Sequence, residues 1–200
     1  MKKKITLVVA LALVLVVGVF GSLAWLTAST DEVTNTFTIG NIQITLTEPN
    51  APTSKEYKVV PGGSATKDPT ITVAKDSESC YVYACVTNTV KVTVNGKETV
   101  VATPNVNATN WVSVCTSGDK TLYRYKEIVN ASNAAADITL PVFTTVTYSD
   151  LITKDNISEI TPTTDKITVD AFAIQSEALT SGVTTADAEA AAHFEMSLAG

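Results

Sequence analysis

Apolar and polar residues alternate along most of the chain beyond residue 33, which is the pattern of β-strands that bury one face. The clearest case is Cys80 to Val86, in which Val82 and Ala84 fall on one face and Tyr83 and Cys85 on the other. Clusters of glycine, proline and asparagine separate such segments, as turns between strands do. The pattern predicts strands at residues 34–39, 42–46, 56–60, 69–73, 80–86, 90–94, 97–101, 111–115, 121–128, 140–148 and 166–175.

Two adjacent pairs of these strands are expected to form hairpins. Asn95-Gly96 links the first pair, because a two-residue turn needs residues that accept positive φ. The second hairpin is expected to turn within Thr116–Lys120. Pro141 predicts an edge strand, since proline has no N–H to donate to a ladder. The only clear helix is predicted to begin at Thr185, its N-cap, and to end near Met196.

These elements together predict the fold class. Many short strands at regular spacing, with turn signals between them, are typical of an antiparallel two-layer sandwich or jelly roll. We therefore expect a single all-β domain at 25–200, with a short C-terminal helix. A different kind of segment, 1–24, precedes it.

The first 24 residues have the pattern of an export signal. Three lysines are followed by 16 uncharged residues, Ile5–Phe20. Ser22 and Ala24 then place small residues at the −3 and −1 positions of a signal peptidase site, with Trp25 after the cut. A membrane anchor is the alternative, but a spanning helix needs about 20 apolar residues. We expect a cleaved signal peptide and an exported product that touches the membrane only while the signal is attached.

Charge narrows the choice of partners. The chain has 14 basic and 20 acidic residues, and the leader contains three of the lysines and no acid, so the mature chain has 11 against 20 and a net charge of −9. Nucleic-acid binding needs a basic stripe, and the sequence has a single arginine, Arg124. We therefore expect no nucleic-acid partner.

Three cysteines are an odd number for an exported protein. Cys80 and Cys85 are five residues apart in a predicted strand, so their side chains face opposite sides. At most one of the two is then placed to pair with Cys115. The alternative is that all three are small buried thiols.

Candidates for catalysis are few. The one histidine, His193, shares a helix face with Glu189, but zinc proteases use two histidines at that spacing. A solvated or capping histidine is the simpler interpretation. Ser64 and Lys67 match a Ser-x-x-Lys motif, which works on a helix, whereas glycine and proline flank it here. We expect no enzyme activity, cofactor or metal site on these grounds.

Two further groups of side chains could bind a ligand. The aromatic residues could form a ligand platform, although packing in the core is their more common use. The turn carboxylates could hold calcium weakly, although such groups are usually just solvated. The aromatic residues are Trp111, Tyr123, Tyr125 and Phe143, and the carboxylates are Asp68, Asp76, Glu78 and Asp119.

Several motifs, in order along the chain, resemble the TasA/camelysin family of Gram-positive bacteria. The resemblance begins in the export region, at residues 21–27 and then at Asn35–Gly40. It continues at residues 67–70, 80–83, 111, 123–125, 140–143 and 171–175. It implies a jelly-roll protein whose signal peptide is processed by a dedicated signal peptidase of the SipW type. Some family members form extracellular matrix fibres in which each subunit lends its N-terminal strand to the next.

The mature N-terminus therefore suggests a function. Cleavage frees a strand-forming arm whose apolar residues need burial, and an open sheet edge on another copy can accept it. We expect a secreted subunit of the cell surface or biofilm matrix, a head-to-tail homopolymer that other matrix proteins join. The donor residues would be Trp25, Leu26, Val33, Phe37 and Ile39.

The sequence leaves three alternatives open. The arm can fold back into its own sheet and leave a monomer. Camelysin is a surface metallopeptidase, so a peptidase is the second candidate, with His193 as the residue to test. The third is a monomeric sandwich that binds a ligand in a pocket lined by Trp111, Tyr123 and Tyr125.

Overall fold

Segments with period-2 alternation form strands, and in the described part of the chain these strands pair into four antiparallel sheets. A computed structural model describes residues 41–50, 58–161, 164–177, 179 and 181–198, and the backbone of Thr27–Thr30. The prediction of an all-β antiparallel fold with one short C-terminal helix is confirmed.

The largest sheet, sheet A, has five strands. Their order is β1-β13-β5-β10-β9, and every neighbouring pair is antiparallel. The central ladder joins β5 and β13, which pair over nine residues each. The strands are β1 (Thr27–Thr30), β5 (Cys80–Asn88), β9 (Trp111–Ser117), β10 (Lys120–Tyr125) and β13 (Ile167–Gln175).

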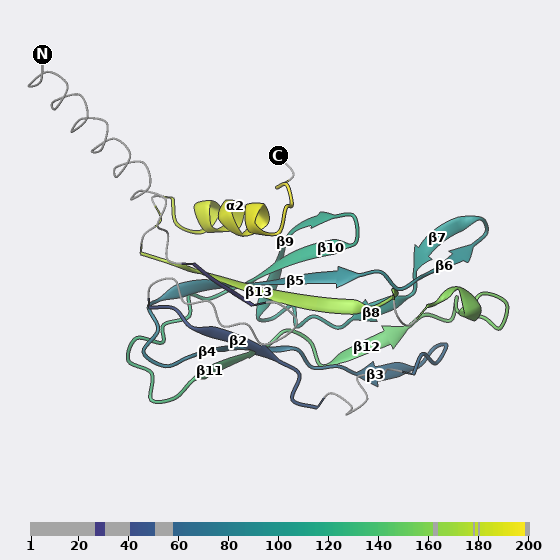
Figure 1. Ribbon diagram of the computed structural model, residues 1–200, viewed down its shortest axis with the longest axis horizontal. Coiled ribbons are helices and arrows are strands. Elements are labelled where there is room, and N and C mark those ends of the chain that lie inside the picture. Colours follow the sequence, from purple (N-terminus) through teal and green to yellow (C-terminus); the bar gives the residue numbers. More distant parts are fainter. Residues whose placement is uncertain are drawn as a thin grey trace, which may run out of the picture.

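Two smaller sheets lie on one face of sheet A (Figure 1). Sheet B has the order β11-β4-β2, and sheet C has the order β3-β12-β8. A separate hairpin, β6–β7, projects from one end of the molecule (Figure 1). The strands are β2 (Ile44–Thr47), β3 (Ser64–Thr66), β4 (Thr70–Val73), β6 (Lys91–Val94), β7 (Lys97–Val100), β8 (Ala102–Pro104), β11 (Ile138–Pro141) and β12 (Thr145–Tyr148).

The main core fills the space between sheet A and sheets B and C. Alternate residues of each strand point into it, as the period of a strand requires. Sheet A contributes Val82 and Ala84, sheet B contributes Ile71, and sheet C contributes Val146, all of them buried. The layers therefore form a β-sandwich.

The opposite face of sheet A is covered by α2 (Val183–His193) (Figure 1). Tyr83 and Phe172 of the sheet are buried there with Ala186 and Ala190 of the helix, in a second apolar cluster. Sheet A is thus buried on both faces. The helix has eleven residues, and no helix in the described part of the chain is long and apolar enough to cross a membrane.

Both predicted hairpins are confirmed, and their turns differ in type. Asn95 and Gly96 have φ of 51° and 77°, as a type I′ turn between β6 and β7 requires. The turn between β9 and β10 is shorter than expected, because Ser117 and Lys120 already pair. Gly118 is the first of the two residues in that turn. Its φ is 58°, and this turn type requires positive φ at its first position, which glycine accepts.

The single strand predicted at 140–148 is wrong. Its residues form β11 in sheet B and β12 in sheet C, and the chain crosses between the sheets at Val142–Thr144. Val142 and Phe143 are neighbours and are both buried, which a half-buried strand cannot achieve. Pro141 does lie on an edge strand, β11, as predicted.

The strand predicted at 56–60 is also wrong over its described part. Lys58–Val60 is not a strand, and Val60 is 44% exposed, so no apolar face is buried there. The chain turns at Pro61–Gly62, where the N–H of Gly63 donates to the carbonyl of Val60 (2.8 Å). The next strand along the chain is β3. The strand predicted at 34–39 lies outside the described residues.

The predicted ends of the helix are corrected at both sides. It begins at Val183 and not at Thr185, because Gly182, with φ of 53°, turns the chain directly into the first helical residue. It ends at His193, and Glu195, with φ of 56°, follows in a turn that buries Met196.

Trp111 is a central residue of the main core. It is 2% exposed, and its ring packs edge-on against Tyr125 with centroids 5.3 Å apart. Its Nε1–H donates to the carbonyl of Pro141 at 2.9 Å, so the polar tip is satisfied and sheet A is tied to the edge of sheet B.

We predict that Trp111→Ala lowers the free energy of unfolding by about 3–5 kcal/mol, because it leaves a cavity between two sheets. Urea unfolding followed by circular dichroism measures the loss. Ile128→Ala is the control, since Ile128 is 48% exposed and its truncation should cost less than about 0.5 kcal/mol. Equal losses in the two variants would contradict a core role for Trp111.

Candidate functional site

The outer edge of β13 is the feature of the fold best suited to bind another chain segment. On its inner edge β13 pairs with β5 along all nine residues, from Ile167 to Gln175. On its outer edge β1 pairs with four of them, in the register Thr27↔Ile174 to Thr30↔Ala171. This pairing covers Ala171–Ile174, in the C-terminal half of β13.

The other sheet edges are less suited to accept a strand. On β9, Leu122 and Tyr123 of β10 face Cys115 and Ser113, so Val114 is an extra residue in a β-bulge. Bulges disrupt pairing at an edge. The edges of sheets B and C are three or four residues long, and two of them contain Pro104 or Pro141. With β1 set aside, the outer side of β13 is therefore the longest regular edge in the described part of the chain.

Strand β2 lies beside this edge. It contacts both β1 and β13, although it belongs to sheet B. Its Ile44, together with Ile42 just before it, is fully buried in the main core. The edges of the two layers therefore meet where the N-terminal part of the chain enters the sandwich.

Within the predicted N-terminal arm, the structure describes Thr27–Thr30, and these residues form a strand that pairs within the same chain. The structure contains one chain, and in it β1 pairs with the β13 that comes later in the same sequence. This is the monomeric arrangement, in which the arm folds back into its own sheet. The sequence leaves it open as the alternative to exchange of the strand between copies. The predicted cleavage and donor residues, Ser22, Ala24, Trp25, Leu26, Val33, Phe37 and Ile39, lie outside the described residues.

The three cysteines are free and buried thiols. Cys80 faces the main core, while Cys85 and Cys115 face α2, so Cys80 and Cys85 lie on opposite sides as expected. Cys85 and Cys115 both pair with Leu122 of β10, which separates them by two strand spacings, about 10 Å. A disulfide needs Cα atoms roughly 4.4–6.8 Å apart. The disulfide alternative is therefore not realised, and the buried-thiol alternative is.

Burial makes these thiols weak acids. It raises the pKa of Cys80 to about 12 and that of Cys85 to about 11, and it also raises the pKa of Cys115. Burial is likewise the main cause that raises the pKa of Tyr83. The folded protein therefore keeps all four groups protonated, and uncharged, at neutral pH.

His193 is the last residue of α2 and packs against aromatic rings. Its ring stacks on Phe172 with centroids 4.5 Å apart and meets Phe194 edge-on at 4.7 Å. Glu189 lies one turn earlier on the same exposed side of the helix. Among the residues that the structure describes, no three or more His, Cys, Asp or Glu side chains are grouped to hold a metal ion.

The Ser-x-x-Lys motif is not helical. Ser64 lies in the three-residue strand β3, so it and Lys67 are not presented as they would be on one helix face. Lys67 forms an ion pair with Glu48. The aromatic residues proposed as a platform, with Trp111 and Phe143 buried, pack in or against the main core.

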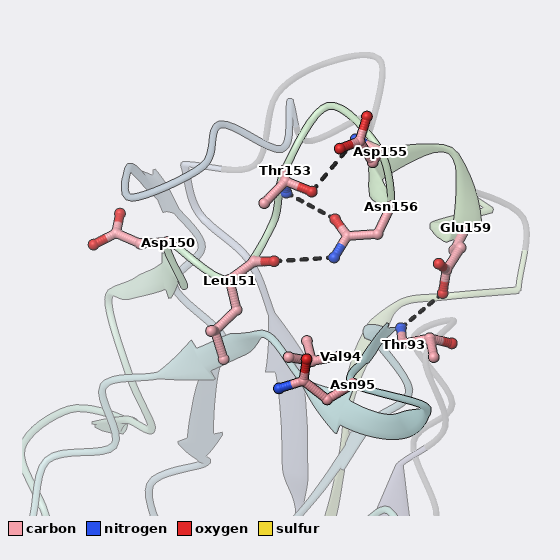
Figure 2. A pocket seen from close by; sticks show the side chains of 9 residues that line it. All are labelled: Thr93, Val94, Asn95, Asp150, Leu151, Thr153, Asp155, Asn156 and Glu159. Carbon is pink, nitrogen blue, oxygen red and sulfur yellow. Dashed lines mark hydrogen bonds between the residues drawn. The ribbon is translucent and has the colours of Figure 1, made fainter.

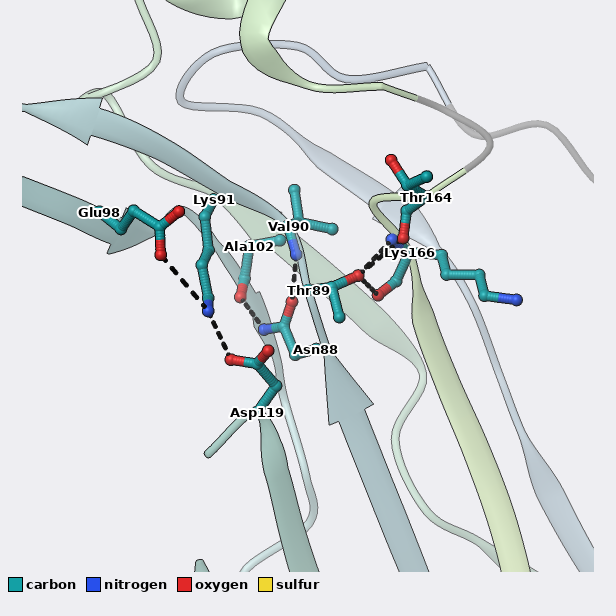
Figure 3. A network of polar contacts seen from close by, with 9 residues as sticks. All are labelled: Asn88, Thr89, Val90, Lys91, Glu98, Ala102, Asp119, Thr164 and Lys166. Carbon is teal, nitrogen blue, oxygen red and sulfur yellow. Dashed lines mark hydrogen bonds and ion pairs between the residues drawn. The ribbon is translucent and has the colours of Figure 1, made fainter. Parts of the chain in front are cut away.

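Two of the four turn carboxylates, those of Asp68 and Asp119, bind parts of the chain itself. Asp68 accepts hydrogen bonds from the N–H and side-chain amide of Asn50, at 3.2 and 2.7 Å. Asp119 pairs with Lys91 at 2.6 Å, in the network of Figure 3. Asp76 and Glu78 lie in the segment after β4, where the N–H of Glu78 donates to the carbonyl of Asn41.

The same network closes the end of sheet A. The side-chain amide of Asn88 donates to the carbonyl of Ala102 at 2.7 Å and accepts the N–H of Val90 at 3.2 Å (Figure 3). It therefore joins the end of β5 to the starts of β6 and β8. The ion pair of Lys91 with Asp119 connects the β9–β10 turn to the start of β6.

A shallow cleft of about 440 Å³ lies between the β6–β7 turn and the loop before η1 (Ile157–Glu159) (Figure 2). Several of its polar groups already have partners. The carboxylate of Glu159 accepts a hydrogen bond from the N–H of Thr93 at 2.7 Å. The side-chain amide of Asn156 accepts from the N–H of Thr153 and donates to the carbonyl of Leu151, which fixes the loop. The sequence pattern does not indicate this cleft, because the loop and the hairpin that line it lie about 60 residues apart.

We predict a loss of stability in alkali. The folded protein holds the proton on Cys80 up to a pH of about 12, whereas the unfolded chain releases it near 9.0. Stability from this thiol is therefore complete below pH 9 and falls as pH rises through that window. Urea unfolding measured from pH 8 upward should show the fall. Cys80→Ala should reduce its slope by up to about 1.4 kcal/mol per pH unit. An unchanged slope would contradict the role of Cys80.

Comparison with known proteins adds no relative to these observations. The chain matches no protein-family model, no curated protein and no solved structure at a significant level.

Proposed function

We propose that this protein is an exported structural subunit of the cell surface or biofilm matrix, and that its N-terminal strand docks on the β13 edge of a neighbouring copy. One observation supports this most directly. The outer edge of β13 is long, regular and free of proline, and in the described part of the chain it pairs with the four residues of β1. An uncovered strand edge presents backbone N–H and C=O groups that an extended segment satisfies.

Exchange costs little in backbone hydrogen bonds. When β1 of one copy replaces β1 of another, the same ladder with residues 171–174 is formed. The closed monomer and the exchanged form then differ mainly in chain entropy and in contacts outside the ladder, so concentration decides between them.

The geometry of such an exchange gives an open polymer. A copy that lends its β1 leaves its own β13 edge empty, and a third copy can fill that edge. The contact joins two different surfaces, so it is heterologous and continues head to tail unless the rotation closes a ring. The bulge at Val114 makes the opposite edge of sheet A a poor competitor.

The export signal fits this function. A leader at 1–24 would keep the N-terminus on the membrane until a signal peptidase of the SipW type releases Trp25 as the new terminus. Assembly would then begin only outside the cell. The family resemblance supports this order of events, a jelly-roll arrangement of the strands, and an extracellular location with other matrix proteins as partners.

The test is filament formation by the mature chain, 25–200. We expect filaments by negative-stain microscopy, and we expect none after deletion of residues 25–33. Circular dichroism of the deletion variant should remain that of a β protein, because the described main core is built from residues between Ile42 and Ala173. Unchanged filaments from the deletion variant would remove the donor role of the arm.

Point variants make the test specific for the ladder. Backbone N–H groups alternate in direction along a strand, so one of Ala28→Pro and Ser29→Pro removes a donor to β13. That variant should reduce filament yield at least tenfold. Ala28→Val is the matched control, since valine suits a strand and keeps the N–H. Loss of filaments in the valine variant would contradict pairing through β1. Filaments in all three variants would contradict it as well.

A further inference from the structure

The outer face of sheet A is apolar, and α2 is its cover. The helix and the residues on either side of it bury Leu179, Ala186, Ala190, Ala191 and Met196 against this face. The sheet contributes Tyr81, Tyr83, Cys85, Cys115, Leu122, Phe172 and Ile174. Two of the three thiols of the protein therefore lie beneath the helix.

The helix α2 buries little apolar surface against the sheet for a helix of eleven residues. All three buried residues within the helix are alanines, and an alanine side chain removes little apolar area from water. An eleven-residue helix is marginal by itself. No side chain caps its N-terminus at Gly182, so the helix depends on its contacts with the sheet.

A polar contact beneath the helix provides much of that hold. One carboxylate oxygen of Asp187 accepts the hydroxyl of Tyr83 at 2.8 Å and the Nε–H of Arg124 at 2.9 Å. Tyr83 is fully buried, and the side chains of Asp187 and Arg124 are 20% and 17% exposed. Charged hydrogen bonds shielded from water are among the stronger single contacts in a protein. At the other end, Lys120 donates to the carbonyl of Phe194 at 3.0 Å.

The thiols lie on different faces of sheet A, so their reactivity distinguishes exposure of one face from exposure of the other. Cys85 is 1% exposed, and its Sγ lies 4.0 Å from Sδ of Met196, just beyond the helix. Cys115 lies on the same face, two strands away. Cys80 is fully buried in the main core on the other face. Removal of α2 would expose the first two thiols and leave the third covered.

We propose that α2 opens as a separate unit while the sandwich stays folded, and that Cys85 and Cys115 are then sites of modification by small disulfides. The thiol gives its proton to water, and the thiolate attacks one sulfur of a disulfide R–S–S–R. A Cys–S–S–R bond forms, and R–S⁻ leaves. Because about 10 Å separates Cys85 from Cys115, the products are mixed disulfides or bonds to a second copy, and not an internal bridge.

The closed state protects these thiols in two ways. Burial keeps the reagent away, and it raises the pKa of Cys85 to about 11, so very little reactive thiolate is present at neutral pH. The rate of modification therefore follows the equilibrium between closed and open α2.

The test uses three variants of the mature chain, each with two cysteines replaced by alanine and one kept. Each is treated with 5,5′-dithiobis(2-nitrobenzoate), and the coloured thiolate that it releases is followed over time. We expect the variants that keep Cys85 or Cys115 to react at least tenfold faster than the one that keeps Cys80. Equal rates for all three, or reaction of none before global unfolding, would overturn the proposal.

Asp187→Ala tests the polar hold. It should raise the reaction rates of Cys85 and Cys115 by about 10- to 100-fold, because a charged hydrogen-bonded contact is lost, and leave that of Cys80 nearly unchanged. Glu189→Ala is the matched control, since it removes an exposed carboxylate from the same helix. Equal acceleration of all three thiols would show global unfolding and overturn the proposal.

A further measurement needs no change at Asp187. Low concentrations of urea promote an opening in proportion to the surface that it exposes. The reaction of Cys85 should therefore depend on urea less steeply than the reaction of Cys80. Identical dependence would mean that both thiols react through the same global unfolding, against a separately opening α2.

Discussion

The ladder between β5 and β13 is the interaction on which the rest of the structure depends. Both strands run for nine residues at the centre of sheet A, and β5 is buried over its first seven. A strand covered on both faces has no water for its backbone groups, so its N–H and C=O groups must pair within the sheet. Strand β10 satisfies the far side of β5. On the far side of β13, the four residues of β1 are the described partner.

The two ends of the chain meet on one stretch of β13. Residues Ala171–Ile174 pair with β1 through their backbone, while Phe172 and Ile174 pack under α2 through their side chains. The contacts differ in kind: hydrogen bonds in the plane of the sheet and apolar packing perpendicular to it. The proposed assembly through the edge and the proposed opening of α2 would therefore use different interactions of the same stretch of β13.

Local features were predictable because neighbouring residues decide them. The Asn95-Gly96 turn, the opposite facing of Cys80 and Cys85, and the long strand β13 all follow from patterns within ten residues. The helix was found but misplaced at both ends, since Gly182 and not a polar cap starts it. The alternation does not predict the break of 140–148 into two strands, because it continues through residues that lie in two sheets.

The sequence by itself determined the class of the fold and the facing of each strand, since the period of two is a property of the local backbone. Only the tertiary structure decided which edges are covered. It brought Asp187 to Arg124, 63 residues away, and β1 to β13 across most of the chain. Such pairings depend on how whole sheets stack, and many strands with the same alternation could form them equally well until all are placed together.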